Sequence, residues 1–359
     1  MRKKILSVFM GVLLMAAMVG CGSSTDSGTA STSTSSESVS ANSETDTTVT
    51  SSQPEIILKY AELNPSEHPM GQGAEKFAEL VSEKSNGRIK IDLYLSGTLG
   101  DEKTSMQGVQ IGTIDIFRAN ANNMGDYNCN LMNALALPYV FPDIESLHSV
   151  LTGEIGQDLL NEVQASGTQM VGLGYMEEGA RNLFFTDKAV TTLDGLKGLK
   201  IRVPETEVMI KTMEALGANP TPISYSELYT SLQTGVVDGA ENAVTGYVTN
   251  SFQEVAPYYL KDAHTFGPGL IVISEKSWSS LSSDDQEILK NAASETQEYV
   301  FNLSVELENQ YYDGLEESGI EVLEVEDIEN WRSAVKDVYS LYGDDVLELV
   351  TKIQEQVQQ

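Results

Sequence analysis

The sequence predicts an α/β protein built as two lobes, each a mixed, mainly parallel sheet flanked by helices, with one long helix spanning both lobes. Two observations carry this prediction. Strand-like and helix-like segments alternate from Glu55 to about Ile273, which is typical of mainly parallel sheets with helices on their faces. A single helical pattern then runs from Ser283 to about Glu317, which is too long for one small lobe.

The N-terminal region predicts export and attachment to a membrane. Residues 1–21 begin with three basic residues, continue with an apolar run too short for a comfortable membrane span, and end at Cys21, the layout of a secretory signal. The small residues before Cys21 resemble a bacterial lipobox, with Met18 where leucine is usual, and this resemblance implies that Cys21 is lipidated. The alternative is an ordinary signal with a chance cysteine, which would release a free secreted protein.

Residues 22–54 predict a flexible tether, because they consist mostly of Ser and Thr and contain almost nothing that could be buried. A signal, a tether and a globular body together place that body on the outer face of the bacterial cytoplasmic membrane, anchored there by lipid. This location argues against ATP or NAD as a ligand.

The first series of elements belongs to the first lobe, for which we expect residues 55–178 plus 265–305. A helix in this series ends at Asn86-Gly87, a pair that favours a left-handed cap. The expected elements are a strand over 56–62, a helix over 69–85, a strand over 89–95, a helix over 101–111, a short strand over 114–117, a helical pair over 143–166 and a strand over 170–175.

The second series belongs mainly to the second lobe, for which we expect residues 179–264 plus 306–359. Its expected elements are a strand over 199–203, helices over 205–216 and 225–234, and strands over 236–239 and 269–273.

The long helix has its own boundary signals. Ser283 with Gln286 forms a capping-box pattern, and Ser318-Gly319 ends the run of apolar residues. A helix of this length spans roughly 50 Å, so it has to touch both lobes. The alternative is two helices broken near Asn302.

The acidic composition excludes contact with nucleic acid. The 359-residue chain has 53 acidic and 22 basic side chains, a formal net charge of −31, and no cluster of Lys and Arg for phosphates. Cys21 and Cys129 lie on opposite sides of the expected processing site, so we expect no internal disulfide. His68, His148 and His264 match no short metal motif, and we therefore expect neither a metal nor a cofactor.

The sequence also lacks enzyme motifs. It has no phosphate loop, no Gly-x-Ser-x-Gly elbow and no obvious histidine partner for Cys129. Paired carboxylates carry no information in so acidic a chain. We therefore expect a binding protein with no catalytic residues. The rival is an extracytoplasmic enzyme acting on carbohydrate acids, which needs a general acid or base that the sequence does not identify.

Three of the six arginines indicate an anion site. Arg118, Arg181 and Arg202 lie at strand or turn positions among apolar and small neighbours. A guanidinium that loses water there needs an anionic or carbonyl partner, and arginine binds a carboxylate through two parallel hydrogen bonds. For any one of them the alternative is an internal arginine–carboxylate pair, but three in similar contexts favour a ligand.

Four longer stretches together resemble a known family. The chain is similar to the solute receptors of tripartite ATP-independent periplasmic (TRAP) transporters, the DctP family, from Ile56 to about Gln297. The stretches are Gly-Leu-Lys-Gly-Leu-Lys-Ile-Arg-Val-Pro (195–204), Leu-Gly-Ala-Asn-Pro-Thr-Pro (216–222), Ser-Glu-Leu-Tyr-Thr-Ser-Leu-Gln-Thr-Gly-Val-Val-Asp-Gly-Ala-Glu-Asn (226–242) and Ala-Leu-Pro-Tyr-Val-Phe (136–141).

The resemblance implies a periplasmic-binding-protein-like fold, joined by crossing strands, that closes over a small organic acid. Arg202 matches the family arginine that clamps the ligand carboxylate, and Arg181 matches the second arginine of the pocket. Asn242 matches a polar residue that forms a hydrogen bond with the ligand, and Tyr225 matches an aromatic residue that lies against the ligand. The alternative for each of the two is that it only caps a helix. The implied partners are the small and large permease subunits, with the receptor itself a monomer.

Two departures from the family pattern bear on the ligand. Alternation along a strand predicts that Arg118 and Asn120 both point into the pocket, where the family usually has small or polar residues. Either Leu63 or Asn64 occupies a position where a polar ligand contact is common. With Glu177 as a further candidate, these residues favour a sugar acid such as a hexuronate or aldonate. The alternatives are a C4-dicarboxylate receptor and a ligand-sensing surface lipoprotein.

Overall fold

The computed structural model describes residues 54–358. The predicted signal over 1–21, its Cys21 and the predicted tether up to residue 53 lie outside these residues. Within residues 54–358, no helix has both the length and the apolar character that crossing a membrane requires.

Two sheets organise this part of the chain. The first is a five-stranded sheet in the order β2-β1-β3-β10-β4. Strand β1 pairs in parallel with β2 and β3, whereas β10 is antiparallel to both of its neighbours. The strands are β1 (Ile56–Ala61), β2 (Ile89–Tyr94), β3 (Ile116–Asn120), β4 (Met170–Met176) and β10 (Gly269–Ser274).

The second sheet has six strands in the order β11-β9-β5-β8-β6-β7. Strand β5 is antiparallel to β9 and β8, and the remaining neighbours pair in parallel. The strands are β5 (Arg181–Phe185), β6 (Lys200–Val203), β7 (Asn219–Pro222), β8 (Gly239–Ala243), β9 (Tyr258–Thr265) and β11 (Glu321–Glu324).

The single antiparallel strand of each sheet arrives from the other sheet. The chain leaves β4 and enters β5 through residues 177–180, and it returns from β9 to β10 through residues 266–268. This arrangement confirms the expected fold of two α/β lobes with mixed, mainly parallel sheets and crossing strands. Because both crossings connect strand ends, they bring residues of the two sheets together at one place.

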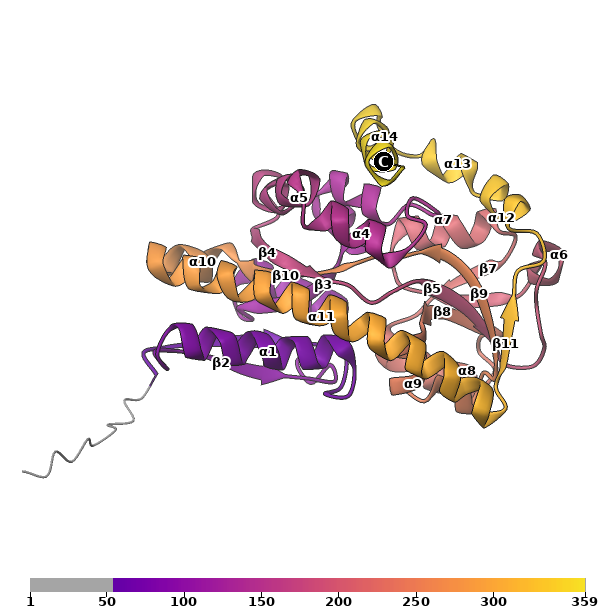
Figure 1. Ribbon diagram of the computed structural model, residues 1–359, viewed down its shortest axis with the longest axis horizontal. Helices are drawn as coiled ribbons and strands as arrows, with labels where there is room; N and C mark the ends of the chain where they lie inside the picture. Colours follow the sequence, from indigo (N-terminus) through magenta and orange to yellow (C-terminus); the bar gives the residue numbers. More distant parts are fainter. Residues whose placement is uncertain (1–53, 359) are drawn as a thin grey trace, which may run out of the picture. The chain divides into compact units, whose positions relative to one another are not determined.

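Helices cover the sheets, as Figure 1 shows. Helix α1 packs on β2, α5 packs on β4, and the C-terminal helix α14 packs on α4 and η2. The expected limits of the two lobes stay a prediction. The helices are α1 (Pro69–Lys84), α2 (Glu102–Ile111), α3 (Ala121–Met124), η1 (Gly125–Tyr127), η2 (Asn130–Leu135), α4 (Ile144–Leu151), α5 (Glu154–Ala165), α6 (Leu193–Leu196), α7 (Glu207–Ala215), η3 (Tyr225–Glu227), α8 (Leu228–Gln233), α9 (Val244–Thr249), η4 (Phe252–Glu254), α10 (Glu275–Ser280), α12 (Ile328–Ala334), α13 (Lys336–Tyr339) and α14 (Asp344–Val357).

The long helix α11 (Ser283–Ser318) is one continuous element of 36 residues, so the alternative of a break near Asn302 is wrong. It packs against helix α1 and strand β4 on the side of the first sheet, and against helix α9 and strand β11 on the side of the second (Figure 1). The predicted capping box is displaced by one residue: Ser282 is the N-cap, and its Oγ accepts from the backbone N–H of Asp285. The backbone at Ser282 is extended, which is the conformation a cap requires.

Two strands lie further along the chain than the sequence predicts. Strand β3 starts at Ile116, and its pairing with β10 continues to Asn120; the Asp115 carboxylate just before it accepts from the backbone N–H of Lys59. Strand β8 replaces the expected strand over 236–239, and the Asp238 carboxylate just before it accepts from the backbone N–H of Lys200. Both shifts carry polar residues into positions at the ends of buried strands.

The core fills both faces of the first sheet. Along β10, Leu270 and Val272 belong to one apolar cluster, and Ile271 and Ile273 belong to the other. This alternation is the period of two that a strand imposes. A strand buried on both faces is a rigid support for the residues at its ends.

Candidate functional site

The strand ends of the two sheets meet around a small cavity of about 30 Å³. Six of the residues predicted to bind the ligand line it, as do both Leu63 and Asn64. The predicted residues are Arg118 and Asn120 of the first sheet, and Arg181, Arg202, Asn242 and Tyr225 of the second sheet and the η3 segment.

Arg202 presents its charge to this cavity. Its Nε donates to the backbone carbonyl of Ile223 at 2.8 Å, and its guanidinium carbon lies 5.7 Å from the centre of the Tyr225 ring. Among residues 54–358, no carboxylate lies within salt-bridge distance of it, and its two terminal nitrogens form no hydrogen bond. A buried cation of this kind is stabilised by an anion, and arginine can bind a carboxylate through two parallel hydrogen bonds.

Burial acts on the charge of Arg202 directly. The residue is 3% exposed. Burial lowers the pKa of Arg202 below its usual value, and the attraction of the Glu241 carboxylate only partly offsets this effect. A guanidinium nevertheless stays protonated at any physiological pH. The lowered pKa therefore means that binding an anion would relieve an unfavourable buried charge.

Arg181 is paired internally. Its Nε and Nη2 donate to the two carboxylate oxygens of Glu241 at 2.6 and 2.9 Å, and Nη2 also lies 3.3 Å from the Glu241 carbonyl. Burial acts to lower the pKa of Arg181, but the attraction of Glu241 outweighs it, and the pKa lies above its usual value. The sequence left this internal pair open as the alternative to a ligand contact.

The Arg181–Glu241 pair continues into a buried chain of charges. His264 Nε2 lies 3.5 Å from Glu241, and His264 Nδ1 lies 2.8 Å from Asp262. Burial opposes the charge of His264, but Asp262 and Glu241 raise its pKa to about 9. Burial likewise opposes the charge of Glu241, but Arg181 and His264 lower its pKa to about 2. Arg181, Glu241 and His264 are therefore ionised near neutral pH.

Arg118 forms the second internal pair. Its Nε and Nη2 donate to the Glu62 carboxylate at 3.0 and 2.9 Å, and its Nη1 donates to Asn120 Oδ1 at 2.6 Å. Gly269 leaves room for this side chain, because a Cβ there would lie 2.7 Å from Arg118 Cδ. Burial acts to lower the pKa of Arg118, but Glu62 outweighs it and raises the pKa. Asn120 in turn donates to Glu102 at 2.8 Å.

Tyr225 and Asn242 are held together at the cavity wall. The Tyr225 oxygen accepts from the side-chain amides of Asn242 at 3.2 Å and Asn250 at 2.9 Å, which leaves its own proton to be donated. Asn242 does not cap the following helix, because the N-cap of α9 is Ala243 and no side chain caps it. Tyr225 likewise does not act as the cap of η3, because Ser224 occupies that position.

Sequence reasoning missed two carboxylates of the cavity, Glu102 and Glu178. It proposed Glu177 instead, which is wrong for the cavity. Both Glu177 oxygens lie 3.1 Å from His148 Nδ1, and Oε1 also accepts from Gln297 of α11 at 3.2 Å. The position of Glu178 three residues before Arg181 was the available signal.

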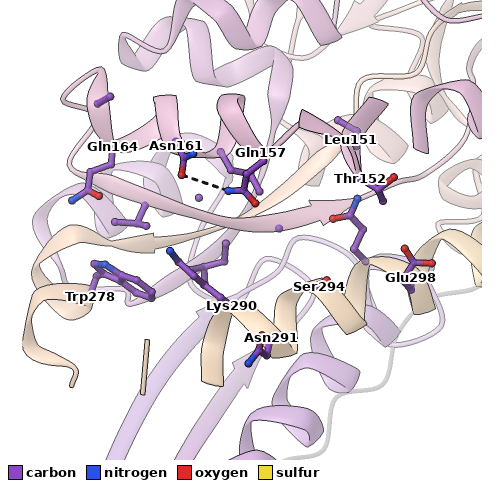
Figure 2. A pocket seen from close by; sticks show the side chains of 18 residues that line it. Leu151, Thr152, Gln157, Asn161, Gln164, Trp278, Lys290, Asn291, Ser294 and Glu298 are labelled. Atoms are coloured by element: carbon purple, nitrogen blue, oxygen red, sulfur yellow. Dashed lines mark hydrogen bonds between the residues drawn. The ribbon is translucent and has the colours of Figure 1, made fainter. Parts of the chain in front are cut away.

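A second, larger hollow lies away from the arginines, between α5, β4 and α11, as Figure 2 shows. Amide side chains dominate it, and Gln157 donates to Asn161 at 3.4 Å. Its basic residue is Lys290, which lies over the Trp278 ring at 5.5 Å. None of the predicted ligand residues lines this hollow, so it does not offer a carboxylate clamp. Across residues 54–358, no cluster of His, Cys, Asp and Glu forms a candidate metal site.

Comparison with known proteins shows the family of this chain. Residues 60–344 match the family model described as bacterial extracellular solute-binding protein, family 7. The chain is 32% identical over 290 residues to the 2,3-diketo-L-gulonate-binding periplasmic protein YiaO of Escherichia coli K12, covering 78% of this chain and 87% of that protein. It is 29% identical over 264 residues to the C4-dicarboxylate-binding periplasmic protein DctP of Rhodobacter capsulatus, covering 74% and 78%.

A solved structure is similar over nearly its whole length. It is a TRAP periplasmic solute-binding protein from Bradyrhizobium sp. BTAi1 in complex with α/β-D-galacturonate, with a TM-score of 0.80 and 32% sequence identity. The match covers 83% of this chain and 99% of the other. The chain therefore belongs to family 7 of the bacterial extracellular solute-binding proteins, the DctP family of TRAP transporter solute receptors.

Proposed function

We propose that this receptor captures a sugar acid, a hexuronate or an aldonate, and delivers it to the membrane permease of a TRAP transporter. Arg202 supplies the carboxylate clamp, and Asn120, Tyr225 and Asn242 supply hydrogen bonds to the rest of the ligand. The observation that carries the proposal is the contrast among the arginines: Arg118 and Arg181 are each balanced by a buried glutamate, whereas Arg202 faces the cavity with its terminal nitrogens unpaired among the described residues.

The site supports capture by closure of the lobes. Arg118 and Asn120 come from the first sheet, and Arg202 and Asn242 come from the second, so a ligand between them contacts both lobes. Contacts made only when the lobes are closed are what shift the equilibrium toward the closed form. Binding and release need no bond to be made or broken, and we propose that the protein is not an enzyme.

A C4-dicarboxylate is the second candidate ligand, because the Rhodobacter relative is named for such ligands. A dicarboxylate has two charged ends, and the second end needs a cation of its own. The other two arginines of the cavity already hold Glu62 and Glu241 at hydrogen-bond distance. The Glu178 carboxylate, which lines the cavity, matches hydroxyl groups better than a second carboxylate.

A panel of ligands tests the proposal. Purified protein is titrated with D-galacturonate, D-glucuronate, D-galactonate, succinate and malate while its thermal unfolding is followed. A true ligand at a hundredfold excess over its dissociation constant should stabilise the fold by about 2.7 kcal/mol. We expect at least one sugar acid to do so. Stabilisation by succinate or malate and by no sugar acid would support the second candidate instead.

The attachment and partners of the receptor are also proposals. Lipidation of Cys21 would hold the protein at the outer face of the cytoplasmic membrane, and small and large permease subunits would receive the ligand from a monomeric receptor. Metabolic labelling with a fatty acid, with Cys21→Ser as the control, tests the anchor. The labelled band should disappear in the variant, and a label that persists would exclude lipidation at this residue.

A further inference from the structure

Glu178 differs from the other carboxylates around the cavity. Its side chain is 8% exposed, and its nearest basic nitrogens are Arg181 Nη1 at 3.8 Å and His68 Nε2 at 3.9 Å. Both distances exceed those of a hydrogen bond. Glu102 accepts from Asn120, whereas the Glu178 carboxylate receives no hydrogen bond from residues 54–358.

His68 does not supply the missing partner. Its Nδ1 accepts from the backbone N–H of Met70 at 3.0 Å, which places the proton of the neutral ring on Nε2. Burial lowers the pKa of His68, although the Glu178 and Glu62 charges oppose this effect. The ring is therefore neutral near pH 7 and faces Glu178 with a single N–H across a gap of 3.9 Å.

The surroundings of Tyr225 show that the cavity has two poles. Burial raises the pKa of Tyr225, the Glu178 charge raises it further, and the charges of Arg202 and Arg181 lower it. The ring therefore lies within the influence of the Arg202 cation and of the Glu178 anion, which has Arg181 Nη1 at 3.8 Å but no hydrogen-bond donor among residues 54–358. A ligand that fits both poles carries a carboxylate at one end and hydrogen-bond donors further along.

Resting on the function proposed above, we infer that Glu178 accepts hydrogen bonds from hydroxyl groups of the bound acid and thereby selects polyhydroxylated acids over C4-dicarboxylates. A buried carboxylate that lacks donors is costly, and a ligand hydroxyl removes that cost. The second carboxylate of a dicarboxylate would instead meet a like charge, which disfavours its binding. Glu178 thus attracts polyhydroxylated acids and repels C4-dicarboxylates.

The test compares Glu178→Gln with Glu316→Gln, an equal change of charge at an exposed position of α11 that does not line the cavity. D-galacturonate, D-glucuronate and D-galactonate are titrated calorimetrically into the wild type and both variants. We expect Glu178→Gln to weaken the sugar acids by roughly 10- to 100-fold, and Glu316→Gln to leave each dissociation constant within about threefold.

A series of monodeoxy analogues of the bound sugar acid identifies the contact itself. For at least one hydroxyl, its removal should weaken binding to the wild type and have little further effect in Glu178→Gln, because both changes delete the same hydrogen bond. Strict additivity at every hydroxyl, or affinity within about threefold of the wild type in Glu178→Gln, would overturn the inference and leave the proposed function standing.

Two further measurements separate a failure of the Glu178 inference from misfolding of the variant and from a failure of the proposed function. Thermal melts of the unliganded variants verify folding. If Glu178→Gln does not fold, Glu178→Asp replaces it, because this change keeps the charge and shortens the side chain by one methylene. Glu178→Asp should then bind the sugar acid less tightly than the wild type, with a smaller loss of affinity than that expected for Glu178→Gln. An undiminished affinity in Glu178→Asp would then count against the inference. A wild type that binds none of the sugar acids would refute the proposed function, and the inference with it.

Discussion

Arg202 Nε donates to the backbone carbonyl of Ile223 at 2.8 Å, and this contact holds the guanidinium with its terminal nitrogens toward the cavity. The carbonyl binds one nitrogen and neutralises no charge. Arg118 and Arg181 show the opposite arrangement, in which a glutamate takes two nitrogens and balances the charge. A single backbone contact therefore separates an arginine available to a ligand from two that support the site.

Glu241→Gln should destabilise the fold, because it leaves the buried Arg181 charge without its partner. Breaking one side of a buried pair costs about 3–5 kcal/mol. Urea unfolding of the variant and the wild type measures the difference. Glu205→Gln, an exposed change of the same kind, should cost less than about 1 kcal/mol. Equal stability of Glu241→Gln and the wild type would exclude a structural role for the pair.

Protonation of His264 should make stability depend on pH in the alkaline range. Asp262 and Glu241 raise its pKa in the folded protein to about 9, from an ordinary value of 6.5. The contribution of His264 is therefore complete below pH 6.5 and is lost as the pH rises through 9. The free energy of unfolding of His264→Gln, relative to the wild type, should be lowest near pH 6 and approach the wild-type value above pH 9. A difference that stays constant from pH 6 to 10 contradicts this assignment.

Protonation of Glu308 should make the free energy of unfolding depend on pH between about 4.5 and 7. Burial raises its pKa to about 7, although Lys261 opposes the shift, and a Cβ at Gly179 of the crossing segment would lie 2.7 Å from Glu308 Oε2. A raised carboxyl pKa stabilises the fold below the ordinary value of 4.5, and this contribution is lost as the pH rises through 7. Glu308→Gln should therefore stabilise the protein at pH 8 and not at pH 4.5. Chemical denaturation at both pH values measures this effect, and equal changes at the two would rule it out.

Much of the fold could be predicted from the sequence because its signals are local. The spacing of apolar residues along α11 and the alternation of strands and helices need no knowledge of distant contacts. Strands β5 and β9 were missed because they carry the charged and polar residues of the site, such as Arg181, Asn182, Asp262 and His264. Buried polar residues in a strand resemble a loop in sequence, since only tertiary pairing explains them.

The sequence could predict residues that line the cavity, but it could not predict which acidic residues pair with the arginines there. Six of the predicted residues line one cavity and Glu177 does not, and Arg118 pairs with Glu62 and Arg181 pairs with Glu241 across 56 and 60 positions of the chain. With 53 acidic residues available, nothing in the sequence selects these two as partners. The choice follows from strand order, because β3 lies beside β1 and β5 lies beside β8.

Calorimetric titration of Arg202→Ala with the sugar acid that binds the wild type tests the central claim most directly. Arg332→Ala is the matched control, because this arginine is half exposed, pairs with Glu329 and does not line the cavity. We predict that Arg202→Ala retains a cooperative melt and loses at least about a hundredfold in affinity, the loss expected for a buried charge-assisted pair, while Arg332→Ala binds as the wild type does. Near-normal affinity in a folded Arg202→Ala would contradict the claim that Arg202 clamps the ligand carboxylate.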